Sequence, residues 1–163
     1  MNIEFDFKLS ELRKLEERAN SIVNLAVAAT AVTGTIPVSL IDLPLLIIEQ
    51  TIMMSKICSV FDIKIEEECL KSLAISAIYT EWSGLFGKTI LKSMTKTIPF
   101  VGAIIGCTIS SAVSGMVTMS MGKAFIEICK MHKLGMLSYE DFVSSQGRNL
   151  MKKSFLNNFK KKM

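Results

Sequence analysis

The sequence predicts an all-α protein, a bundle of about six helices in a single domain that spans residues 1–163. Half of the residues are hydrophobic and 21% are charged, which supplies enough apolar side chains for a core and excludes a disordered chain. Pro occurs only at positions 37, 44 and 99, and runs of β-branched residues are interrupted by Ala, Met, Leu and Ser. Long helices with short breaks therefore explain the pattern better than strands do.

The composition divides the chain into three parts. Residues 1–18 form a charged lead-in, residues 19–135 a hydrophobic helical core, and residues 136–163 a basic amphipathic C-terminal helix. The net charge of +4 lies mainly at the C-terminal end, since residues 148–163 carry six bases and no acid. The acidic start does not resemble a secretory signal, and four widely spaced Cys residues indicate buried free thiols in a reducing compartment.

The first helix is expected from Ser10 onward, because apolar residues then recur at three- and four-residue steps until Gly34 and Pro37 stop it. The stretch T-G-T-I-P that ends at Pro37 returns as T-K-T-I-P, which ends at Pro99. We therefore expect two helical hairpins with Pro-containing links, where the Pro is tolerated because a first helical turn leaves its N–H groups unpaired. Duplication of one helical hairpin would explain why the stretch returns. Chance recurrence of a common helix-stop signal is the alternative.

The second helix is expected to end near Phe61. Asp42 is well placed to cap its N-terminus, and Pro44 to occupy a position in its first turn. A third helix should begin at Asp62, with acids in the first turn, where the helix dipole favours them. A weak point at residues 83–84 separates this helix from a shorter helical piece.

The longest uncharged run, Thr97–Gly122, predicts a central helix that continues to Gly135. Small residues at every fourth position would let other helix backbones approach closely; they are Gly102, Gly106, Ser110, Ser114, Thr118 and Gly122. The run has 26 residues, enough to span ~30 Å of hydrocarbon, and Ala19–Ile41 is a second uncharged run of 23. A central helix buried within a bundle is the alternative to a membrane span.

A last helix is expected after Gly135, because Ser138 and Asp141 have the spacing of a capping box. Its aromatic and aliphatic residues lie opposite a basic face, which suits an anionic membrane surface. The basic residues are Arg148, Lys152, Lys153, Lys160, Lys161 and Lys162. A solvated terminal helix is the alternative. The aromatic residues form no stacking platform, so we expect no nucleic-acid partner.

The sequence predicts no catalytic, cofactor-binding or metal-binding residues. The stretch Trp82–Thr89 resembles a phosphate-binding loop, but Trp82 stands where the first Gly is needed and no strand precedes it. The only histidine, His132, lies near a helix end, where a cation suits the dipole, and we expect it at the surface. No convincing Ser-His-Asp, Cys-His or metal-ligand arrangement can be assembled around it.

Three motifs resemble the family called "domain of unknown function 697". They are I-P-x-x-x-x-D-x-P-L at Ile36–Leu45 with Gln50 beyond it, I-P-x-x-G-x-x-x-G at Ile98–Gly106, and T-x-x-x-G-K-A at Thr118–Ala124. The likeness covers about residues 19–130. The resemblance implies a hydrophobic helical domain of the kind found beside bacterial Era-like and interferon-inducible-type GTPases and in inner-membrane proteins. Because only a short charged stretch precedes the helical region here, the GTPase would have to act in trans.

Together these observations predict a non-enzymatic, membrane-associated helical accessory or effector protein at the inner (cytoplasmic) membrane or its cytoplasmic face. The expected partners are anionic lipids, a separate GTPase and other copies of the chain. A soluble cytoplasmic bundle that oligomerises and serves as a protein-binding module is the alternative. A small pore-forming or toxin-like protein that uses the small-residue helix is the third candidate.

Overall fold

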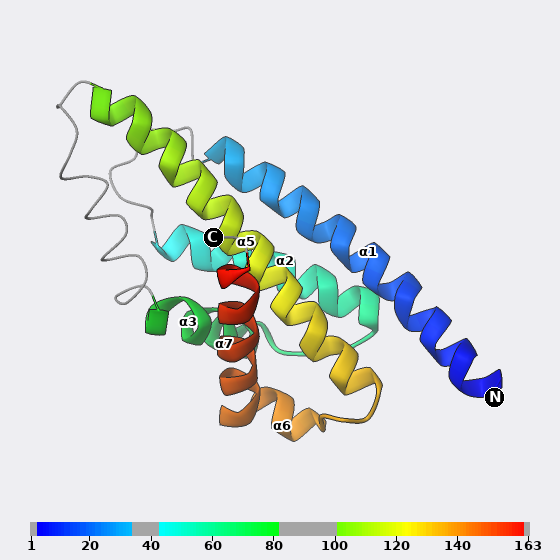
Figure 1. Cartoon of the computed structure of the whole chain (residues 1–163). Coiled ribbons are helices and arrows are strands. Elements are labelled where there is room, and N and C mark those ends of the chain that lie inside the picture. The colour runs from blue at the N-terminus through cyan, green and yellow to red at the C-terminus, as the bar shows by residue number, and fades with distance from the viewer. Residues whose placement is uncertain (1–2, 34–42, 82–100, 162–163) are drawn as a thin grey trace.

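The computed structural model describes residues 3–33, 43–81 and 101–161, with side chains over residues 6–30, 46–78 and 114–161. These segments form six helices, and no strand occurs within them, so the all-α prediction is confirmed (Figure 1). The helices are α1 (Ile3–Thr33), α2 (Leu43–Phe61), α3 (Glu67–Glu81), α5 (Val101–Lys133), α6 (Tyr139–Val143) and α7 (Ser145–Lys160). The predicted roles of Pro37, Asp42 and Pro99 lie outside the described residues, whereas Pro44 is the second residue of α2.

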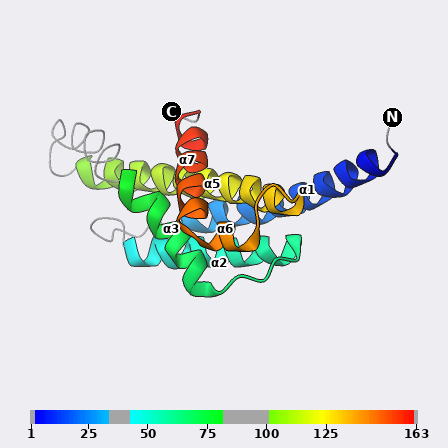
Figure 2. The ribbon, with the colours of Figure 1, turned by 90° about the horizontal axis from the view of Figure 1, so that it is seen from below.

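Helix α5 is the centre of the bundle and contacts α1, α2, α6 and α7. Helix α1 runs along α5, and α2 contacts both of them (Figure 1). Helices α3 and α7 contact each other and run across the other three (Figure 2). The protein therefore has a lengthwise group of three helices, α1, α2 and α5, with α3 and α7 laid across it.

Helix α1 begins at Ile3 rather than at the expected Ser10, so the charged lead-in is part of the helix. Leu12 is buried and Leu15 packs against the core, while Arg13 and Lys14 between them are exposed. This spacing places the apolar residues on one side of a helix and the charges on the other. The lead-in is thus amphipathic.

The prediction that a helix begins at Asp62 is wrong, because Asp62 instead ends the preceding one. Its φ of 53° is left-handed, a conformation that Asp tolerates better than most residues. The N–H of Ile63 then donates to the carbonyl of Cys58 at 3.0 Å, which closes the end of α2. Helix α3 begins only at Glu67, and Glu67 and Glu68 lie in its first turn.

The C-terminal part forms two helices rather than the single helix expected. Ser138 caps α6, since its Oγ accepts from the backbone N–H of Asp141 at 3.1 Å. Ser144 then has an extended backbone; its Oγ donates to the carbonyl of Asp141 and accepts from the N–H of Gln146. Serine side chains compete with helical backbone bonds in this way, which explains the break.

The core lies between the lengthwise helices α1, α2 and α5 and the helices α3, α6 and α7 that pack on them. Large side chains that are almost fully buried include Phe61, Phe125, Phe142 and Phe155. The rings of Phe125 and Phe142 meet edge to face with centroids 5.9 Å apart. Burial of one such side chain contributes roughly 1.5–3 kcal/mol. These contacts hold α6 and α7 against the central helix.

Within the described residues, no helix combines the length and the apolar character that a membrane crossing requires. The run Thr97–Gly122, which predicted a span, is described at side-chain level only from Ser114 onward. There Ser114 and Thr118 are buried, and Gly122 lies against α1. The described part of the small-residue row is therefore already covered by the protein's own helices, whereas Gly102, Gly106 and Ser110 lie outside the described side chains.

Gly122 sets the distance between α1 and α5. A Cβ at this position would lie 2.7 Å from Cγ1 of Val23, a side chain that is fully buried. Gly115 lies about two turns earlier in the same helix, and there an added Cβ would meet Val27 at an ordinary van der Waals distance of 3.7 Å. The two glycines thus form a matched pair, of which only Gly122 marks a close helix approach.

Gly122→Ala is expected to destabilise the protein, because overpacking a tight contact typically costs ~1–3 kcal/mol. Gly115→Ala is expected to stabilise it by up to ~1 kcal/mol, since Ala is the better helix former and its Cβ would make only an ordinary van der Waals contact with Val27. Urea unfolding followed by circular dichroism would measure both changes. Equal effects of the two substitutions would contradict the close approach at Gly122.

Candidate functional site at the junction of helices α1, α2 and α5

A buried hydrogen bond links α2 to α5. Nε2 of Gln50 donates to Oγ1 of Thr118 at 2.9 Å, and both side chains are fully buried. Oε1 of Gln50 has no hydrogen-bond partner among the described residues. A hydrogen bond of this kind contributes ~1 kcal/mol net, whereas a buried polar group left without its partner costs ~1–3 kcal/mol. The junction therefore tolerates Gln50 only while Thr118 is present.

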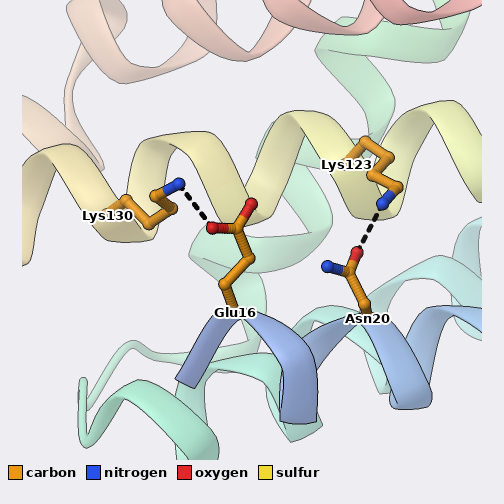
Figure 3. A network of polar contacts seen from close by, with 4 residues as sticks. All are labelled: Glu16, Asn20, Lys123 and Lys130. Atoms are coloured by element: carbon orange, nitrogen blue, oxygen red, sulfur yellow. Dashed lines mark hydrogen bonds and ion pairs between the residues drawn. The ribbon is translucent and has the colours of Figure 1, made fainter. Parts of the chain in front are cut away.

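Two lysines of α5 reach across to α1 (Figure 3). Nζ of Lys123 donates to Oδ1 of Asn20 at 2.6 Å, and Nζ of Lys130 forms an ion pair with Oε2 of Glu16 at 2.7 Å. The Lys130 and Glu16 side chains are 32% and 38% exposed, so the pair contributes at most ~1 kcal/mol. The two contacts mainly fix the antiparallel register of α1 on α5.

The motif T-x-x-x-G-K-A coincides with this junction. Thr118 bonds to α2, Gly122 lies against Val23, Lys123 bonds to α1, and Ala124 is fully buried. Each fixed position of the motif thus has a packing or bonding role inside the bundle. Gln50, which stands alone in the sequence beyond the first motif, is the partner of its Thr.

A family model described as "Domain of unknown function (DUF697)" matches residues 4–152. The chain belongs to this family. The predicted resemblance is therefore confirmed, and the match extends beyond residues 19–130 at both ends. No curated protein and no solved structure matches the chain. In this DUF697 protein the T-x-x-x-G-K-A motif and Gln50 meet at a helix junction, where their side chains pack and form hydrogen bonds.

The basic residues predicted to meet a membrane lie on α7 and at its end. Lys153, Lys160 and Lys161 are exposed, Arg148 and Lys152 are half-buried, and Lys162 lies outside the described residues. The opposite side of α7 is buried, with Met151, Phe155 and Phe159 in the core. Helix α7 thus presents charge outward while its aromatic side chains pack inside the protein.

Glu127 of α5 fixes α7 in this orientation. Its carboxylate accepts hydrogen bonds from Oγ of Ser154 and from Nδ2 of Asn158, the latter at 3.3 Å. Nδ2 of Asn158 also donates to the backbone carbonyl of Ser154 within α7. These bonds bridge the two helices outside the aromatic core, so α7 is attached to α5 by both polar and apolar contacts.

Two cysteine thiols lie side by side between α2 and α5. Cys58 and Cys129 are both buried and free, and they lie close to each other. Burial, and then the neighbouring Cys58, raises the pKa of the Cys129 thiol well above its ordinary value. Burial also raises the pKa of Cys69, which is only half-buried, although Arg148 opposes the shift. Raised pKa values keep thiols protonated and therefore poor nucleophiles at neutral pH.

His132 stabilises the turn between α5 and α6 and is half-buried rather than at the surface as expected. Its Nδ1 lies 2.8 Å from the carbonyl oxygen of Leu137, and its ring meets that of Phe142 edge to face. Gly135, with a φ of 71°, supplies the left-handed residue that this turn needs. In the parts of the chain described, no three His, Cys, Asp or Glu side chains are placed to hold a metal ion.

Thr118→Val is expected to destabilise the protein by ~1–3 kcal/mol, because it leaves the amide of Gln50 buried without a partner. The double variant Gln50→Met, Thr118→Val is expected to be more stable than Thr118→Val alone, since it removes the orphaned amide with little change of volume. Chemical unfolding of the four proteins of this cycle gives the coupling energy. Strict additivity would show that the bond contributes nothing.

The raised pKa of the Cys129 thiol predicts that the stability of the protein depends on pH. Above the ordinary pKa of 9.0 the thiol ionises in the unfolded chain but stays protonated in the folded protein, so the unfolded state binds fewer protons. The free energy of unfolding should therefore fall as pH rises above about 9, by up to ~1.4 kcal/mol per pH unit for one thiol. Urea unfolding from about pH 8 to pH 10 should show a shallower fall for Cys129→Ala. Identical slopes would contradict the shifted pKa.

Proposed function

We propose that this DUF697 protein is a non-enzymatic accessory module that attaches to anionic membrane surfaces through the basic side of α7. The observation that carries the proposal is that this helix has an exposed basic side and a buried aromatic side. Lys153, Lys160 and Lys161 are exposed, whereas Phe155 and Phe159 are buried in the core. The module would therefore bind headgroups by charge, without inserting an apolar helix face.

This mode of attachment is peripheral and reversible. Each Lys near an anionic surface contributes about 1 kcal/mol, so three lysines give only modest binding. Salt weakens such binding, because exposed charges are screened over about 10 Å at 0.1 M. The cytoplasmic face of the inner membrane, which carries anionic lipids, is the location that fits this chemistry best.

A separate GTPase is the second partner that we propose, and its support is the family resemblance rather than a described surface. A module held at the membrane by α7 leaves its other helices free to bind such a protein in trans. The pore-forming alternative has less support, because Ser114, Thr118 and Gly122 are already covered within the bundle.

Replacing Lys153, Lys160 and Lys161 with Gln is expected to weaken binding to phosphatidylglycerol vesicles roughly a hundredfold, because about 1 kcal/mol is lost per lysine. Co-sedimentation with vesicles at several salt concentrations would measure the affinity and its salt dependence. Phosphatidylcholine vesicles should bind neither protein.

The matched control replaces three exposed lysines elsewhere, Lys14, Lys56 and Lys64, with Gln. It makes the same change in net charge but leaves α7 intact. Binding close to that of the wild type is expected for this control. If both triple variants lose binding equally, net charge rather than α7 governs attachment, and if neither does, the membrane proposal is wrong.

A further inference from the structure

The adjacent thiols of Cys58 and Cys129 come from two helices that are far apart in the sequence. Cys58 lies in α2 and Cys129 in α5, and both are free cysteines. Their side chains are 4% and 0% exposed, and they lie close to each other. A bond between these two sulfur atoms would join α2 to α5 within the core.

The way in which α2 lies along α5 brings the two cysteines together. The hydrogen bond between Gln50 and Thr118 is an independent contact between the same two helices. Cys58 follows Gln50 by eight residues and Cys129 follows Thr118 by eleven, which is about two and about three helical turns. Both cysteines therefore lie broadly on the sides of α2 and α5 that carry the hydrogen bond. The two helices run in the same direction (Figure 1), so they remain neighbours from the first contact to the second.

Cys69 is a third thiol with different surroundings. It lies in α3 and is half-buried, and its Sγ donates to the backbone carbonyl of Val143 at 3.9 Å. It is therefore easier to reach from solvent than Cys58 or Cys129, but its hydrogen bond is directed to the end of α6. This difference makes Cys69 an internal reference for the reactivity of the buried pair.

We propose that Cys58 and Cys129 are a redox-active pair, which a small disulfide such as oxidised glutathione converts into an intramolecular bridge between α2 and α5. Cys58 is the less buried of the two, so its sulfur attacks the small disulfide first, forms a mixed disulfide and releases one small thiol. The sulfur of Cys129 then attacks the sulfur of Cys58 and releases the second small thiol. Each attacking thiol loses its proton, which the departing thiolate takes up. Two protein thiols are oxidised, and one small disulfide is reduced to two thiols.

The bridge would act as a lock on the bundle. It closes a long loop between α2 and α5, and such a bridge stabilises a protein mainly by restricting its unfolded chain. In a reducing compartment the pair stays as thiols, and the bridge forms when small disulfides accumulate. Because both thiols are buried, the reaction is slow. The lock involves no residue of α7, so it does not rest on membrane attachment.

Incubation of the full chain in glutathione buffers of increasing oxidised-to-reduced ratio tests the proposal. Alkylation with N-ethylmaleimide in denaturant, followed by mass spectrometry, counts the thiols that remain. The wild type should lose two of its four thiols, and a protease digest should contain one linked peptide pair with Cys58 and Cys129. Excess dithiothreitol should restore all four thiols. The oxidised protein should melt several degrees above the reduced one.

Cys58→Ala and Cys69→Ala are a matched pair of variants, since each leaves three thiols. Cys69→Ala should still lose two thiols and melt at a higher temperature when oxidised. Cys58→Ala should form no bridge and melt at the same temperature in both buffers. The peptide map of the wild type decides the pairing even where a variant fails to fold.

Three results overturn the proposal. The first is a wild type that keeps all four thiols at the most oxidising ratio, and the second is a glutathione adduct without a bridge. The third is a bridge that contains Cys69 or Cys107 or that joins two chains.

Discussion

The close approach of α1 to α5 at Gly122 is the constraint on which the other contacts depend. A side chain there would overlap Val23, so the two helices could not keep their present distance, and the contacts of Lys123 and Lys130 with α1 span the same pair of helices. Helix α2 contacts both members of this pair and is joined to α5 by the bond between Gln50 and Thr118. Helices α6 and α7 pack on the surface of α5 that remains. In the T-x-x-x-G-K-A motif of this chain, Thr118, Gly122 and Lys123 each make one of these contacts.

The sequence predicted those features that depend on near neighbours. The cap at Ser138, the end of α2 near Phe61 and the end of α5 before Gly135 each depend on residues within one or two turns. The break at Ser144 was missed because its side chain competes with the helical backbone in a pattern that is otherwise helical. The partner of Gln50 was missed for a different reason. Thr118 is 68 residues away, and periodicity within one helix contains no information about which helix lies opposite.

Helix α7 shows how one sequence pattern can serve two purposes. Its alternation of aromatic and basic residues is equally compatible with an interfacial membrane helix and with a helix packed on a protein core. The sequence cannot distinguish these cases, because lipid and protein interior are both apolar surroundings for Phe155 and Phe159. The structure places both side chains in the core, so any lipid contact is left to the lysines. Membrane attachment then becomes a matter of charge and salt concentration rather than of inserted apolar area.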